Sequence, residues 1–138
     1  MYLVDTNVIS ELRNGTRADA GVRAFFAHTH SAELFLPVQV VGELRACARR
    51  LRLRGDIIQA DRLDKWIDSL VEEHGSHLLE FDLECAQIWG LLMGASPHNP
   101  VDKQIAAMAY CRGLTVVTRN MLDFDHPNLT TLNPFLSP

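Results

Sequence analysis

The sequence has little of what marks secreted, zinc-binding or membrane proteins. Its three cysteines, Cys47, Cys85 and Cys111, are widely spaced, which argues against a disulfide framework or a zinc site. We expect each to be a small, buried apolar side chain within a helix. No apolar run approaches the ~20 residues that span a bilayer, and the first residues lack the basic and long apolar regions of a signal peptide. We therefore expect a cytoplasmic protein that makes no use of membranes.

Extremes of composition are also absent. The chain has 138 residues, of which 47% are hydrophobic and 22% charged, and no repeat, linker or low-complexity segment divides it. These values predict a single domain over residues 1–138. The net charge of −4 does not indicate a general nucleic-acid binder, but five of the eleven arginines lie within ten positions. Such a local basic face suits phosphate contacts and equally suits docking of an acidic partner segment. These five are Arg45, Arg49, Arg50, Arg52 and Arg54.

Short apolar runs alternate with helical patterns along the chain. This alternation predicts an α/β sandwich with a mainly parallel sheet, in which ligands bind beyond the carboxyl ends of the strands. We expect Asn99 to cap a helix whose first residue is Pro100. The predicted strands cover residues 2–4, 34–36, 78–79, 114–118 and 129–132. A first predicted helix starts at Asp5-Thr6-Asn7 and is stopped by Asn14-Gly15, and the other predicted helices cover 19–28, 38–53, 57–73, 83–93 and 100–112.

Four acidic residues from distant segments lie where that edge of the sheet is expected. Asp5 directly follows the first strand, and Asp123 comes five residues after the strand that ends at Thr118. Asp102 lies in the first turn of the helix from Pro100, and Glu43 lies in the helix after the second strand. Carboxylates that converge repel one another, and a divalent cation removes that penalty. An oxygen-only ligand set favours Mg²⁺ or Mn²⁺, which suits phosphodiester hydrolysis by bound water.

Each acid also has a purely structural interpretation. Asp5 would serve as a helix N-cap. Asp102 would complement a helix dipole, as would Asp123 if Asn120 capped a short turn. Glu43 is harder to explain in this way, because it shares the apolar face of its helix. A carboxylate in that position needs a metal or an arginine such as Arg119 to offset its desolvation.

Five blocks of the sequence match one known family in order and at the expected spacing. They read LVDTNVISEL (3–12), ELR (43–45), PVDKQIAA (100–107), VTRNMLDF (117–124) and LNPF (132–135). Together they closely resemble PIN-domain toxins of the VapC type, the ribonuclease half of type II toxin–antitoxin pairs. The resemblance implies a three-layer α/β/α sandwich and an endoribonuclease that depends on Mg²⁺ or Mn²⁺. It carries the family's catalytic and metal-binding acids over to Asp5, Glu43, Asp102 and Asp123.

The resemblance also implies surroundings and partners for that site. Thr6, Asn7 and Asn120 match the polar residues around the metal, whereas Asp125 is expected to be solvated. Lys103 departs from the family pattern, and we expect it either to touch substrate phosphate or to face solvent. The family implies a bacterial or archaeal source, an RNA substrate, a cognate antitoxin and a homodimer, with promoter DNA bound only through the antitoxin. Candidate contacts for antitoxin or RNA are Arg45, Arg49 and Arg50; candidate dimer contacts are Trp66 and Trp89, although both also suit the core.

Three other classes of protein fit parts of the pattern. A receiver-type signalling domain usually has adjacent acids after the first strand and a late lysine, whereas this chain has one acid there and Arg119. A haloacid-dehalogenase-type phosphatase requires a second aspartate two residues after the first, and this chain has Asn7. A binding module with a toxin-like fold and no turnover is the third alternative.

Overall fold

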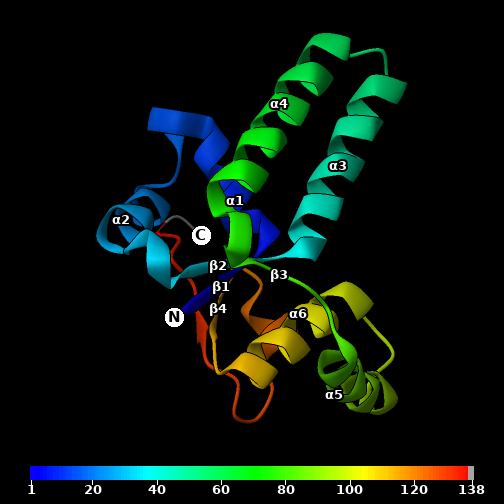
Figure 1. The fold of residues 1–138 in the computed structure, drawn as a ribbon. Coiled ribbons are helices and arrows are strands. Elements are labelled where there is room, and N and C mark those ends of the chain that lie inside the picture. The colour runs from blue at the N-terminus through cyan, green and yellow to red at the C-terminus, as the bar shows by residue number, and fades with distance from the viewer. Residues whose placement is uncertain (137–138) are drawn as a thin grey trace.

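A five-stranded parallel sheet forms the centre of the molecule (Figure 1). The computed structural model describes residues 1–136. From β1 the chain adds β2 and β3 on one side of the sheet, and then returns to add β4 and β5 on the other. Adjacent strands β1 and β4 therefore form the topological switch point, where open parallel sheets bind ligands. The strands are β1 (Tyr2–Val4), β2 (Leu34–Pro37), β3 (Leu78–Leu79), β4 (Thr115–Val117) and β5 (Thr131–Leu132), in the order β3-β2-β1-β4-β5.

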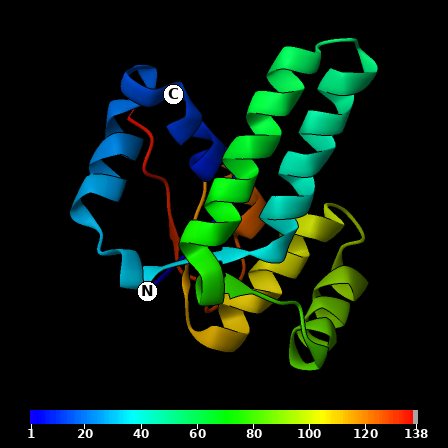
Figure 2. The same ribbon diagram turned by 45° about the horizontal axis from the view of Figure 1, so that its top comes forward.

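Six α-helices cover the two faces of this sheet. Helices α1 to α4 pack on one face, while α5 and α6 pack on the other (Figures 1 and 2). Helices α3 and α4 form a long hairpin that extends beyond the sheet. The predicted three-layer α/β/α sandwich is confirmed. The helices are α1 (Thr6–Glu11), α2 (Ala20–His28), α3 (Val38–Leu53), α4 (Ile57–His74), α5 (Leu83–Ala95) and α6 (Pro100–Arg112), with 3-10 turns at Leu12–Arg17, Ser31–Glu33, Gly75–His77 and Met121–Phe124.

The two central strands supply both cores, because successive side chains of a strand point to opposite faces. Val4 and Val117 are fully buried against α1 to α4. Leu3 and Val116 are fully buried against α5 and α6. Since β1 pairs in register with β4, these residues lie side by side on each face. The helix layers on both faces therefore hold β1 and β4 in place, and with them the carboxyl edge of the sheet.

The structure corrects three details of the sequence analysis. Asn99 occupies the N-cap position of α6 as predicted, but it adopts a left-handed conformation, with φ of 53°, and its side chain makes no capping hydrogen bond. Lys103 is buried and its ammonium donates to the carbonyl of His98, so the expectation that this side chain faces solvent is wrong. Helix α1 ends at Glu11, and a 3-10 segment with Gly15 at φ of 57° continues to Arg17.

Other side chains lie as expected or close to it. All three cysteines are free, with Cys85 buried and the other two half-buried. Trp66 packs against the core beneath the guanidinium of Arg13, and Trp89 donates to the carbonyl of Pro100 at 3.0 Å. Within residues 1–136, no helix is long and apolar enough to cross a membrane.

Candidate functional site

Asp5 lies at the switch point because the chain turns there from β1 into α1. Its backbone N–H donates to the carbonyl of Val117 at 2.9 Å, which continues the pairing of β1 with β4. The residue is only 3% exposed. One carboxylate oxygen accepts from the backbone N–H of Thr6 at 2.7 Å, so the predicted capping role is real. Asp5 therefore serves the fold and also lies at the expected edge of the sheet.

Thr118 and Asn7 hold the second oxygen of the Asp5 carboxylate. The Thr118 hydroxyl donates to it at 2.9 Å, and the Asn7 amide donates at 3.2 Å. The Asn7 amide oxygen accepts from the backbone N–H of Arg119 at 3.0 Å, which ties α1 to the segment after β4. Asn120 contributes its backbone N–H, which donates to Thr118 at 3.0 Å. Asn7 thus bonds to the Asp5 carboxylate through its side chain, whereas Asn120 takes part through its main chain.

Glu43 and Asp123 reach the same edge from other layers. Thr6 donates its hydroxyl to Glu43 at 2.8 Å, so a threonine of α1 rather than an arginine partners this carboxylate. Asp123 lies in the 3-10 turn Met121–Phe124 and accepts from the Asn99 side-chain amide at 2.9 Å. This contact explains why Asn99 makes no capping hydrogen bond. Asn120 occupies the N-cap position of that turn, with Asp123 in the first turn, but the Asn120 side chain makes no capping hydrogen bond.

The carboxylates of Asp5, Glu43 and Asp123 lie close enough to Asp102 to affect its pKa. Burial is the main reason why the pKa of Asp102 is raised to about 6; the nearby carboxylates of Asp5, Asp123 and Glu43 contribute to this rise in that order, and Lys103 opposes it. The pKa of Asp5 is also raised, mainly because the group is buried and also because Asp123 is close, although its three hydrogen bonds oppose this. Four segments that are distant in sequence therefore place their carboxylates within electrostatic range of each other.

The four acids lie near one another, but their positions in the described residues do not form a complete set of metal ligands. Across residues 1–136, no three histidine, cysteine, aspartate or glutamate side chains stand at coordination distances from one point. Hydrogen bonds from Thr6, Thr118 and Asn99 occupy oxygens of three of the four carboxylates. The four carboxylates nevertheless suit a hard divalent cation, because all of the potential metal ligands are oxygen atoms. A positive charge among them would also relieve the repulsion between the carboxylates.

Sequence reasoning missed Thr118 and Asn99. Thr118 directly follows β4, so the rule that pointed to Asp5 after β1 was sufficient to find it. Its β-branched side chain instead suggested one more strand residue. Asn99 was obscured because an Asn-Pro pair is a common helix start. Asp125 is exposed as expected, and Asp82 caps α5 by accepting from the N–H of Cys85 at 3.0 Å.

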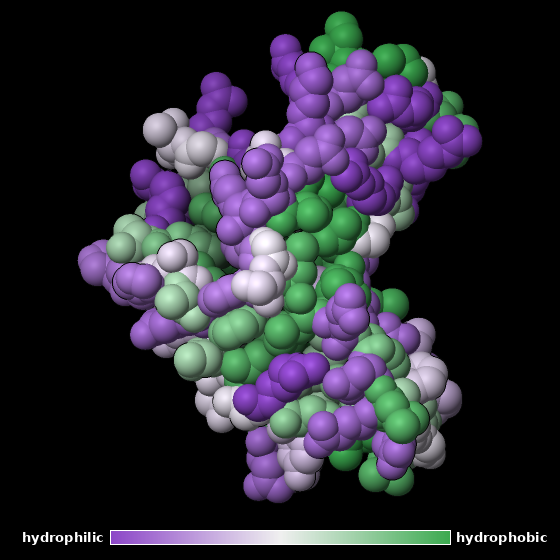
Figure 3. Space-filling model, viewed as in Figure 1, coloured by the Kyte–Doolittle hydropathy of each residue, from purple (hydrophilic) through white to green (hydrophobic). Residues whose placement is uncertain are grey.

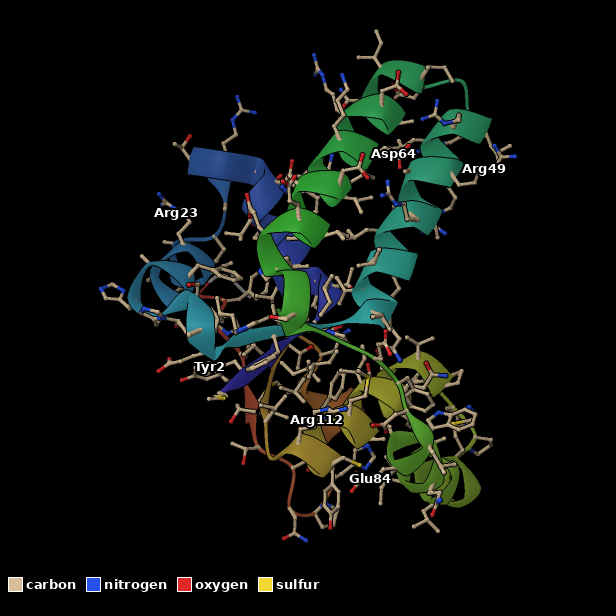
Figure 4. The ribbon with its side chains drawn as sticks, viewed as in Figure 1. Tyr2, Arg23, Arg49, Asp64, Glu84 and Arg112 are labelled. Carbon is tan, nitrogen blue, oxygen red and sulfur yellow. The ribbon has the colours of Figure 1, made fainter. Side chains whose placement is uncertain are left out.

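The arginines of α3 divide into two groups. Arg45 forms ion pairs with Asp64 and Asp68 of α4, at 2.8 and 2.6 Å. Arg49 is exposed on the outer side of α3, away from Asp64 (Figure 4). Arg50 is also exposed and donates to the sulfur of Cys47 at 3.2 Å. Of the three candidate contact residues, Arg45 thus has partners within the chain, while Arg49 and Arg50 face outward.

Comparison with known proteins agrees with this geometry. The PIN domain family model matches residues 2–126, and the chain belongs to that family. The receiver-type and phosphatase alternatives are thereby excluded, and the strand order also differs from the 2-1-3-4-5 order of receiver-type sheets.

Similar proteins cover nearly the whole chain. It is 30% identical to the plasmid stability protein StbB of Pseudomonas syringae pv. tomato, over 98% of this chain and 99% of that protein. It is also 30% identical to the VapC ribonuclease Y4jK of Sinorhizobium fredii, over 98% of both. Among solved structures, FitAcB from Neisseria gonorrhoeae superposes with a TM-score of 0.79 at 28% identity, over 97% of this chain and 98% of that one. FitAB bound to an IR36 DNA fragment gives 0.80 at 26% identity, over 97% and 95%.

Proposed function

We propose that this chain is a metal-dependent endoribonuclease and the toxin of a VapBC-type toxin–antitoxin pair, with its 138 residues acting as one PIN domain. The observation that carries the proposal is the convergence of Asp5, Glu43, Asp102 and Asp123 at the switch point, where burial and mutual repulsion raise the pKa of Asp102 to about 6. Two relatives of similar length support it, since one is named a VapC ribonuclease and another a plasmid stability protein.

The four carboxylates would hold Mg²⁺ or Mn²⁺. When bound, such an ion polarises a phosphoryl oxygen and lowers the pKa of a water molecule that attacks the phosphodiester bond. Thr6, Thr118 and Asn7 orient the carboxylates of Glu43 and Asp5 through the hydrogen bonds described above. Such outer partners fix the direction of ligand lone pairs and so the position of the ion.

The first test is RNA cleavage by the purified chain. We expect cleavage with Mg²⁺ or Mn²⁺, loss of cleavage in EDTA, and recovery when the metal is restored. Asp5→Asn should abolish cleavage, while the matched control Asp125→Asn, which removes an exposed acid nearby, should keep it. Cleavage that persists after rigorous chelation, or in Asp5→Asn, would contradict the mechanism. Folded protein without any cleavage in any metal would favour a binding module instead.

The proposed partners are a cognate antitoxin, RNA and a second copy of the chain, in the cytoplasm. The similar solved structures include FitAB bound to DNA, so we propose that promoter DNA is contacted only through the antitoxin. The outward-facing Arg49 and Arg50 suit an acidic antitoxin segment or RNA phosphate, since neither forms an ion pair within residues 1–136. Reversing both to Glu should weaken antitoxin binding by about tenfold or more, as loss of charge complementarity does. Arg23→Glu on α2 is the matched control, and equal affinity of both variants would reject this surface.

A further inference from the structure

Lys103 is a buried cation in an unfavourable place. It is only 7% exposed, and it is the fourth residue of α6, near the end of the helix where the dipole disfavours positive charge. Lysine is seldom buried without a partner, because its ammonium loses its hydration. Asp102, a proposed metal ligand, precedes it directly. The needs of the helix and of the core alone do not account for a lysine at this position.

Lys103 holds the loop 96–99, which joins α5 to α6. Its ammonium donates to the carbonyl of His98, and its backbone N–H donates to the carbonyl of Asn99 at 3.1 Å. Figure 3 shows that the surface is indented between the α3–α4 hairpin and the α5–α6 layer, and this loop lies on the lower side of the indentation (Figures 1 and 3). One residue of α6 thus contacts the last two residues of the loop.

Asn99 has a backbone conformation that needs such support. Its φ of 53° and ψ of 60° lie in the left-handed region, which residues other than glycine seldom adopt. The residue before a proline is moreover normally extended, and Pro100 follows directly. Backbone strain of this kind persists only where surrounding contacts impose it, and it is common at functional sites. The two hydrogen bonds from Lys103 are contacts that impose it.

The conformation of Asn99 brings its side chain to one of the four acids. The side-chain amide donates to a carboxylate oxygen of Asp123 at 2.9 Å, across 24 positions of the sequence. Asp123 lies in the short 3-10 turn Met121–Phe124, not in a long helix or a strand. The bond therefore ties this turn to the loop between α5 and α6, and it restricts the direction of the Asp123 carboxylate.

We propose that Lys103 is a positioning residue of the nuclease site, which acts through His98 and Asn99 on Asp123. The inference rests on the proposed function, because it takes Asp123 to be a metal ligand. The ammonium holds the loop, the loop holds Asn99 in its left-handed conformation, and the Asn99 amide keeps the Asp123 carboxylate directed toward the other acids. Outer-shell partners of this kind typically change metal affinity or activity by about 10- to 100-fold.

The sign of the effect on metal affinity separates this role from two others. Lys103 is close enough to Asp102 to oppose the rise in its pKa. If only this charge mattered, its removal would leave the acids more negative and would strengthen the binding of a divalent cation. If positioning matters, its removal releases the Asp123 carboxylate and weakens binding. A contact between Lys103 and RNA phosphate would instead affect KM and leave metal affinity unchanged.

Calorimetric titration of the full chain with Mn²⁺ measures this sign. Lys103→Met keeps an unbranched apolar stem and removes the ammonium, and we expect it to lower Mn²⁺ affinity by about tenfold or more. The exposed Lys65 of α4 provides the matched control, since Lys65→Met should bind as wild type does. Circular dichroism checks folding, and Lys103→Ala is the second variant should Lys103→Met not fold. Affinity that rises or stays the same in the folded variant would overturn the proposal.

A double-mutant cycle tests whether Lys103 acts through Asn99. Asn99→Gly removes the amide but suits the left-handed backbone, so it isolates the bond to Asp123. It should lower Mn²⁺ affinity about as much as Lys103→Met does. In the double variant, the second substitution should add less than about twofold, because both changes break the same series of contacts. Losses that multiply would show that the two residues act independently, which contradicts the proposal.

The metal-free protein gives a readout that does not depend on the nuclease. The side-chain amide signals of Asn99 in a nitrogen–proton correlation NMR spectrum are identified by their absence in Asn99→Gly. They should move in Lys103→Met and stay in place in Lys65→Met. Signals that do not move in Lys103→Met would overturn the proposal even if Mn²⁺ affinity fell. A wild-type protein that binds no Mn²⁺ would contradict the proposed function, whereas these signals test the link between Lys103 and Asn99 separately.

Discussion

Aspartate residues have opposite electrostatic surroundings on the α3–α4 hairpin and at the carboxyl edge of the sheet. On the hairpin, Asp64 accepts from Arg45 and Arg52, at 2.8 and 3.0 Å, and its pKa is lowered, chiefly by Arg45. At the edge, burial and neighbouring acids raise the pKa of Asp102 to about 6. The partners of Asp5 at that edge are neutral amides and hydroxyls.

This contrast separates acids that support the fold from acids that are available for chemistry. An aspartate paired with arginine already has its counter-charge, and exposed pairs of this kind contribute little to stability. Converging carboxylates without such partners destabilise the folded chain at neutral pH, a cost expected at functional sites. Asp64 on the hairpin thus already has arginine as its counter-charge, whereas the hydrogen-bond partners of Asp5 at the sheet edge are neutral.

The largest expected difference is in catalysis. Asp102→Asn should lower RNA cleavage by at least ~100-fold, since it removes a proposed metal ligand, which should cost more than loss of an outer-shell partner. Asp64→Asn, the same change on the hairpin, should leave cleavage within about twofold of wild type. Initial rates in saturating Mn²⁺ provide the measurement. Equal losses in the two variants would erase the distinction between the regions.

A smaller effect is expected for the buried hydroxyl that orients Asp5. Thr118→Val keeps the size and branching of the side chain but removes the donor to the Asp5 carboxylate. We expect cleavage or metal affinity to fall by about 10- to 100-fold, as for outer-shell partners in general. Thr118→Ser should restore most of it. If Val and Ser variants behave alike, the hydroxyl does not act through Asp5.

The pH dependence of metal-free stability should follow from Asp102. Its folded-state pKa of about 6 exceeds the ordinary aspartate value of 3.8, so the folded chain binds this proton more tightly than the unfolded chain does. The resulting stabilisation is fully present below pH 3.8 and is lost as pH rises through about 6. On the hairpin, the pKa of Asp64 is lowered, so its contribution to stability is present above about pH 4 and is lost as the pH falls below that value.

Between pH 5 and pH 7.5 we therefore expect the metal-free Tm to fall in wild type more than in Asp102→Asn. The difference between the two proteins should be about 2–5 °C, given the half-exposed position of the group. Thermal unfolding in EDTA at both pH values measures it. An identical pH dependence of the two proteins would show that Asp102 titrates normally.

The smallest effect is expected on the hairpin. Arg45→Met removes two exposed ion pairs, with Asp64 and Asp68, but keeps most of the apolar stem. The Tm should fall by no more than about 2–5 °C, in line with the small value of surface pairs. Cleavage should not change. A large loss of cleavage in this folded variant would place Arg45 in the functional site.

Much of the fold was readable from local patterns. The helix limits of α3 and α6 and the β-branched strand β4 were predicted almost to the residue, because apolar periodicity and terminal Pro or Gly signals coincide there. The four acids were predicted as a group because each lies near the carboxyl edge expected for the sheet. The blocks shared with the PIN family added the grouping of these acids into one site.

What the sequence did not reveal depends on contacts between distant segments. The Asn99 amide turns to Asp123, 24 positions away, and Lys103 turns inward to the carbonyl of His98. The conformational preferences of the neighbouring residues do not predict either of these side-chain contacts. The pairing of Arg45 with α4 likewise requires the hairpin geometry, since a run of arginines alone indicates an external partner equally well.

The central claim is that the four acids share one cation, and Mn²⁺ binding tests it most directly. Calorimetric titration at pH 7.5 should give a site whose affinity falls by about tenfold or more in each of Asp5→Asn, Glu43→Gln, Asp102→Asn and Asp123→Asn, in line with the cost of disturbing a metal shell. The affinity of Asp125→Asn and Asp64→Asn should equal that of wild type. Binding that is unchanged in all four site variants would contradict the account.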